Sequence, residues 1–217
     1  VRADSLGYKN EKNILVGVSV HLNILNGDLD QLAGGVKSLL ASSERTSVPV
    51  HLNIDGQNWT TARPELWNWW MPDKPGYDPA NRENVEWTDW TPDSAIKIAW
   101  RDWGTQIRIM PPPNIFSPVI IAEHHKGYEK LLPIIAAWRD NLPANKKHLF
   151  AGIRIGWEMG FNYNAYYFEN GNELFEKYPD TNEFDPKRRE MTADGYARDN
   201  FLKVGYAAAT YCDIKTT

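Results

Sequence analysis

Several features are scarce or missing in this sequence of 217 residues. Cys212 is the only cysteine, so the chain holds no internal disulfide and depends on a packed core. No apolar run approaches the roughly 18 residues of a membrane-spanning helix. Basic charge is not in excess, because 24 Lys and Arg stand against 28 Asp and Glu. A net charge of −4 argues against a nucleic-acid partner.

The rest of the composition is that of an ordinary soluble globular protein, with 42% hydrophobic and 24% charged residues. The length falls slightly short of the about 250 residues of a complete α/β barrel. We expect a secreted or lysosomal-type compartment and leave a cytoplasmic one open, because a lone cysteine is compatible with each.

Strand patterns alternate with helix patterns along the chain. Strands are expected at 14–21, 48–54, 105–110 and 150–156, the first of them buried on both faces. Helices are expected at 29–39, 91–104, 117–138 and 192–211, with Gly127 and Pro133 breaking or kinking the third. This order predicts an α/β fold with four parallel βα units.

Two predicted strand-to-helix loops are long, at 55–91 and 157–191, and such loops in a compact domain are usually functional. Parallel α/β folds place these loops at the carboxyl ends of the strands, where barrels and open sheets carry their sites. Six of the ten Trp lie in the first loop, and aromatic residues crowd the second. They form either an aromatic surface for sugars or a satellite core.

Glu158 directly follows the last predicted strand, beside Trp157. A carboxyl group next to a water-excluding indole is expected to have a raised pKa, which suits a proton donor. The alternative is a structural Glu158 paired with Arg154 or Arg101. Either way, the residue lies where the working face is expected.

Other polar and aromatic residues near strand ends are candidates for contacts with substrate. They are His21, Asn23, Asp55, Trp59, Asn114, Trp157 and Asn162. Asp55 either binds a sugar hydroxyl or caps its loop, and a lone strand-end histidine such as His21 is often structural. Asn58 begins a glycosylation sequon, which matters only in a secreted chain.

Other chemistries find little support. The run Glu123-His124-His125 lies on a predicted helix with no third ligand nearby, so no metal site is expected. Ser19 has no Gly-x-Ser-x-Gly context. No glycine-rich phosphate loop follows a strand, and no cofactor is expected.

The arrangement resembles the first half of a (β/α)8 barrel glycoside hydrolase of the large retaining clan that includes β-galactosidases and β-glucanases. In that clan the acid/base Glu follows strand four, the place of Glu158, although Trp157 stands where the clan usually has Asn. The resemblance implies that Glu158 protonates the glycosidic oxygen while a second carboxylate, about 5 Å away, attacks the anomeric carbon.

The clan's nucleophile follows strand seven, so the resemblance places it on a further segment. An inverting reaction with Asp55 as base is an alternative, and so is a non-catalytic module that binds a carbohydrate or a protein partner. The acidic balance favours a neutral glycan, because negative charge repels polyanionic chains.

Four βα units make half a barrel, so the whole chain is expected to be the N-terminal half of a catalytic barrel. An open parallel sheet leaves unpaired edges, and we therefore predict a second polypeptide that completes it, either a processed C-terminal chain or a second copy. Size-exclusion chromatography and mass spectrometry of native material are expected to find that partner. A stable monomer of 24.9 kDa would contradict the half-barrel prediction.

Overall fold

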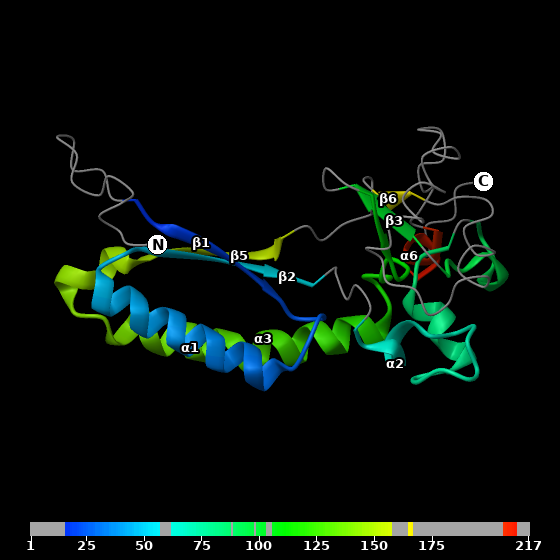
Figure 1. The fold of residues 1–217 in the computed structure, drawn as a ribbon, viewed down its shortest axis with the longest axis horizontal. Coiled ribbons are helices and arrows are strands. Elements are labelled where there is room, and N and C mark those ends of the chain that lie inside the picture. The colour runs from blue at the N-terminus through cyan, green and yellow to red at the C-terminus, as the bar shows by residue number, and fades with distance from the viewer. Residues whose placement is uncertain are drawn as a thin grey trace. The chain divides into compact units, whose positions relative to one another are not determined.

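The computed structural model describes residues 16–56, 62–87, 89–97, 99–102, 106–157, 165–166 and 206–211. The chain divides into two compact units (Figure 1). The first unit holds residues 1–56 and 123–159, and the second holds 57–122 and 160–217. The second unit therefore begins as a long insertion after the second strand of the first.

The first unit is built on a parallel sheet of three strands in the order β1-β2-β5. These strands are β1 (Val18–Asn23), β2 (Val50–Asp55) and β5 (Phe150–Trp157). The predicted strands at 14–21, 48–54 and 150–156 are thus confirmed within the described residues. The protein is a mixed α/β fold with a small parallel sheet.

Two helices accompany this sheet, α1 (Leu29–Thr46) and α3 (Pro118–Asn141). The side chain of Asp28 caps α1 by accepting a hydrogen bond from the Asp30 amide at 2.7 Å. The helix α3 runs through Pro133 without interruption, so the predicted break is wrong. A 3-10 helix, η4 (Ala144–Leu149), leads from α3 into β5.

The core of the first unit lies between one face of the sheet and these helices. Its buried apolar side chains are Leu22, Ile24, Ala33, Val36, Leu40, Val50, Leu52, Ile54, Leu131 and Ile135. A hydrogen bond of 2.7 Å from the Trp138 indole to the Glu44 carboxylate joins α3 to α1. An ion pair between Lys130 and Asp30 joins them again and lowers the pKa of Asp30.

The opposite face of the sheet is polar. Along β1 and β2 every second residue is apolar and belongs to the core, while the residues between them are Ser19, His21, Asn23, His51, Asn53 and Asp55. Ser19 and His21 are exposed, so the prediction that the first strand is buried on both faces is wrong. The reason is the strict alternation in VSVHLN, which is typical of a strand with one buried face.

The second unit contains short helices and an antiparallel sheet. The helices are α2 (Pro64–Trp67), η2 (Pro79–Asn84), η3 (Pro92–Ser94) and α6 (Tyr206–Tyr211). The strands are β3 (Ala99–Asp102), β4 (Gln106–Ile109) and β6 (Ala165–Tyr166), in the order β4-β3-β6. The short α6 lies within the predicted helix at 192–211, the rest of which lies outside the described residues.

Two predictions fail in this unit. The helix at 91–104 is wrong, because Thr91-Pro92 starts only the single turn η3 and the chain then extends into β3. The strand at 105–110 exists as β4, but it pairs antiparallel with β3 and does not join the parallel sheet. A link of three residues between the two strands suits a hairpin, whereas a parallel partner needs a long crossover. The prediction of four parallel βα units is therefore wrong.

The close packing of α3 on the chain after β1 predicts that a larger residue at Gly127 destabilises the protein. A Cβ on Gly127 would lie 2.8 Å from the Cβ of Ile24, whereas one on Gly34, in α1, would meet nothing within 4 Å. Gly127→Ala should lower the free energy of unfolding by about 1 kcal/mol, because overpacking outweighs the gain in helix propensity. Urea unfolding measures this.

The matched control is Gly34→Ala, which adds the same methyl group to an exposed helix position. It should raise the free energy of unfolding by about 0.5–1 kcal/mol. Equal effects of the two substitutions would show that α3 does not approach Ile24 as closely as described.

Candidate functional site

The carboxyl ends of the three parallel strands align one residue from each strand in a row. Asn23 is the register partner of Asp55, and Asp55 is the partner of Trp157. A β-bulge at Gly156, with φ of 78°, sets the last pairing, because Ile54 pairs with Ile155 and one residue is then skipped. Bulges of this kind redirect strand ends beside functional sites, and a positive φ favours glycine.

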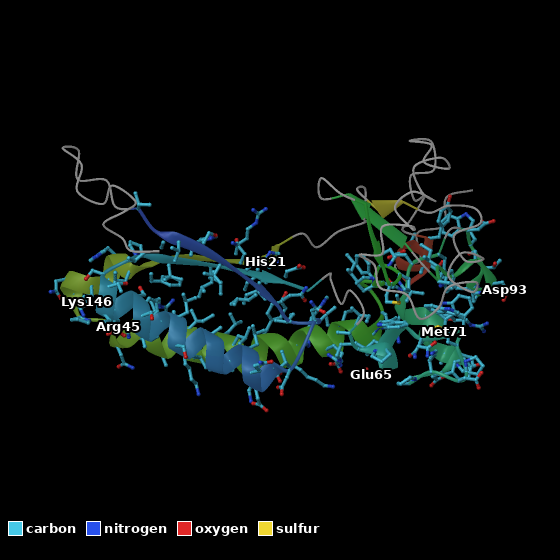
Figure 2. All side chains as sticks on the ribbon, in the orientation of Figure 1. His21, Arg45, Glu65, Met71, Asp93 and Lys146 are labelled. Atoms are coloured by element: carbon cyan, nitrogen blue, oxygen red, sulfur yellow. The ribbon has the colours of Figure 1, made fainter. Side chains whose placement is uncertain are left out.

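Asp55, the middle residue of this row, is hydrogen-bonded to His21 on the neighbouring strand. The Nε2–H of His21 donates to Oδ2 of Asp55 at 2.9 Å. The side chain of Asp55 is 1% exposed, whereas that of His21 is 45% exposed. Figure 2 shows His21 on the sheet, away from α1 and α3. A buried carboxylate thus fixes the tautomer and orientation of an accessible imidazole.

The side chain of Asn23 is engaged locally. Its Oδ1 accepts a hydrogen bond from the Leu25 amide at 3.0 Å, which stabilises the turn after β1. Asn23 therefore lies beside Asp55 in the row, as its strand-end position predicts, and its carbonyl oxygen serves the backbone. Only the amide nitrogen Nδ2 of Asn23 would then contact a substrate.

A second polar chain crosses the same face nearer the start of the strands. The Nδ2–H of Asn53 donates to Oγ of Ser19 at 2.7 Å, and that hydroxyl lies 3.1 Å from Nδ1 of His51. Asn53 is 7% exposed, and its Oδ1 is buried without a hydrogen-bond partner. A buried polar atom without a partner is uncommon in folded proteins.

A histidine of α3 stabilises the backbone that follows Asp55 at the end of β2. The ring of His124, which is buried, donates its Nε2–H to the Gly56 carbonyl at 2.6 Å. Burial lowers the pKa of His124, although the bond to Gly56 and the charge of Asp55 oppose this. Burial and then the charge of Asp55 raise the pKa of Tyr128. Burial therefore favours the neutral form of His124, which serves as a structural donor.

The second unit uses Asn114 structurally. This side chain is fully buried, donates to the Glu83 carbonyl and accepts from the Phe116 amide, both at 3.1 Å. Both amide groups are thus engaged with backbone. The geometry favours a structural role over the predicted contact with substrate.

Two tryptophans of the first long loop belong to the core of the second unit. Trp67 and Trp87 are buried, and their indole N–H groups donate to the carbonyls of Ala62 at 2.6 Å and Arg82 at 2.8 Å. For these two the satellite-core alternative is confirmed. Trp69, Trp70 and Trp90 are half-buried.

Four predicted site residues lie outside the described residues: Asn58, Trp59, Glu158 and Asn162. Glu158 is the residue that follows Trp157, the end of β5, so the sequence alone places it one position beyond the partner of Asp55. Its alternative pairing with Arg154 or Arg101 stays a prediction.

Asn53, His51 and the supporting His124 are not among the site residues predicted from the sequence. Their signal was available, because the pattern V-x-V-H-L-N-I occurs at 18–24 and again at 48–54. Its polar residues alternate with apolar ones, so they share one face of each strand. Because these segments are largely apolar, the polar residues that share one face were not recognised as a group.

These contacts limit the chemistry of the described part of the chain. No cluster of three or more His, Cys, Asp or Glu there could hold a metal ion. Ser19 and His51 approach each other as a nucleophile and base would, but Asp55 binds His21, so Ser19, His51 and Asp55 do not form a triad. What remains is a polar surface of histidine, amide and hydroxyl groups.

No protein-family model matches the chain, and comparisons with curated proteins and with solved structures give no match. None of the described helices is long and apolar enough to span a membrane.

The buried His124 predicts a pH dependence of stability. Its pKa is lowered in the folded protein, so the unfolded state binds a proton first as the pH falls below about 6.5, the ordinary value for histidine. The free energy of unfolding should be independent of this group above that pH and fall below it. His124→Gln, which keeps an N–H donor but cannot titrate, should flatten the profile.

The control is His125→Gln, because His125 is the exposed neighbour on the same helix. Its urea-unfolding profile between pH 5 and pH 8 should keep the slope of the wild-type protein. A His124→Gln profile as steep as that of the wild type would assign the pH dependence to another group.

Proposed function

We propose that the protein is a glycoside hydrolase in which Glu158 donates the proton to the leaving glycosidic oxygen. The observation that carries the proposal is the row of Asn23, Asp55 and Trp157 at the carboxyl ends of three parallel strands, with Glu158 as the next residue. Parallel α/β folds use this edge for chemistry. Polar groups that can bind sugar hydroxyls lie beside it.

In this mechanism Glu158 acts first as acid and then as base. It protonates the leaving oxygen, and a second carboxylate attacks the anomeric carbon in a retaining reaction. Glu158 then deprotonates the water that hydrolyses the glycosyl-enzyme intermediate. The nucleophile is expected on a further polypeptide segment, and the acidic composition favours a neutral glycan.

Asp55 suits a positioning role in this reaction better than that of an inverting base. A base for an inverting reaction must reach a water molecule, whereas Asp55 is buried and hydrogen-bonded to His21. Asp55 orients the accessible imidazole, which then contacts the substrate. This favours the retaining alternative.

The parallel sheet supports the proposal of a barrel completed by a partner. Among the described residues, β1 and β5 are outer strands, and both α1 and α3 pack on the same face. Parallel sheets are almost always covered on both faces. A second polypeptide that extends the sheet would close a barrel around the polar face, with β1, β2 and β5 as successive strands. Among the described residues β5 is the third parallel strand, and Glu158 follows it, so the predicted match to the clan's acid/base Glu after strand four is wrong.

A carbohydrate-binding module without catalysis is the second candidate. The polar face with its exposed His21 favours it as much as it favours the enzyme, since both require contacts with hydroxyl groups. Only the enzyme requires Glu158.

Hydrolysis of a panel of aryl glycosides, with any companion polypeptide present, separates these candidates. Glu158→Gln should lower kcat by at least about a hundredfold, because the substitution removes the proton donor. Glu129→Gln is the matched control, since Glu129 is exposed on α3. It should leave turnover unchanged.

Two outcomes would contradict the proposal. Unchanged turnover in Glu158→Gln would remove Glu158 from the mechanism. No turnover by the wild-type protein, with glycan binding retained, would favour the binding module.

A further inference from the structure

The polar face of the parallel sheet holds one polar atom that the fold does not satisfy. Oδ1 of Asn53 is buried and has no hydrogen-bond partner, while Nδ2 of the same amide is bonded to Ser19. Rotating the amide by half a turn would exchange the two atoms and still leave one of them without a complementary partner. Such an atom destabilises the folded state unless a bound group satisfies it.

The neighbours of Asn53 on the two flanking strands are both hydrogen-bonding side chains. Asn53 lies on the middle strand β2, and its register partners are His21 on β1 and Arg154 on β5. Both flanking side chains are exposed. His21 is additionally anchored to Asp55, which keeps its ring at the border of the site.

The chemistry of these groups defines the ligand. Oδ1 of Asn53 accepts a hydrogen bond, and the guanidinium of Arg154 only donates. In His21 the tautomer whose Nε2–H is bonded to Asp55 makes Nδ1 an acceptor. A hydroxyl group donates one hydrogen bond and accepts others, so a cluster of hydroxyl groups matches this set. The buried acceptor disfavours an anion, which would place negative charge against Oδ1.

We infer that Asn53 is the central residue of a binding site for a neutral polyhydroxylated ring, in which one sugar hydroxyl donates to Oδ1. The inference rests on the proposed function and deepens it by naming the residue that binds the sugar on the sheet. The unsatisfied amide oxygen lowers the free energy of unfolding of the protein without a ligand, and a hydrogen bond from the sugar removes this cost.

The test measures stability and binding in the same variants. Asn53→Leu replaces the amide by an apolar group of similar size, which removes the unsatisfied Oδ1 together with Nδ2, the donor to the exposed Ser19. It should raise the melting temperature by a few degrees. In the Glu158→Gln background it should weaken the binding of methyl β-glycosides of glucose, galactose or mannose about tenfold, as measured by calorimetry.

Two further variants keep the test decisive. Asn141→Leu makes the same substitution at an exposed position of α3, so it should leave affinity unchanged. Asn53→Ala removes the same oxygen with a smaller side chain and should weaken binding if Asn53→Leu does not fold.

The inference is overturned if Asn53→Leu lowers stability and leaves sugar affinity unchanged, because Oδ1 would then be satisfied within the protein or by water. Failure to bind all three methyl glycosides would also overturn it. Hydrolysis by the wild-type protein with an unchanged KM in Asn53→Leu would remove this site and leave the proposed function intact. Full activity of Glu158→Gln would remove that function and leave the binding test standing.

Discussion

The buried carboxylate of Asp55 is the constraint on which the polar face of the sheet depends. A carboxylate removed from water needs hydrogen bonds to replace those it has lost. The imidazole of His21 supplies one at 2.9 Å, from the neighbouring strand. This bond places an accessible histidine beside the strand ends, and the charge of Asp55 also reaches His124 and Tyr128 on α3. Sheet, helix and candidate site therefore meet at a single side chain.

Much of the first unit could be predicted from local pattern, because its helices and strands carry strong apolar periodicity. The capped helix α1 and the strands β2 and β5 fall where the sequence places them. The wrong element types and pairings lie in the second unit, where Trp and Ile residues at 96–103 fit a helical stripe and a strand equally well. The partner of β4 is set by tertiary pairing, which a local pattern does not contain.

The candidate site was predictable to the extent that it depends on strand ends. Strand ends in a parallel sheet lie together, and this brings Asn23, Asp55 and Trp157 into one row. Prediction of the hydrogen bond from His21 to Asp55 would also require the register of β1 on β2, because the two residues are not direct register partners. The unsatisfied amide oxygen of Asn53 could not be predicted from the sequence, because only the three-dimensional packing shows which buried polar atoms have hydrogen-bond partners.

The repeated pattern V-x-V-H-L-N-I has a consequence for how the sheet chooses its alignment. The two copies lie 30 residues apart in sequence, but β1 and β2 pair with an offset of 32, as in Val18 with Val50. A slip of two residues would match the copies like with like and keep every apolar side chain on the helix side, so burial alone hardly separates the two alignments. It would set His21 opposite His51 and abolish the bond to Asp55. The polar face thus selects the correct alignment of a sheet whose hydrophobic face would accept either.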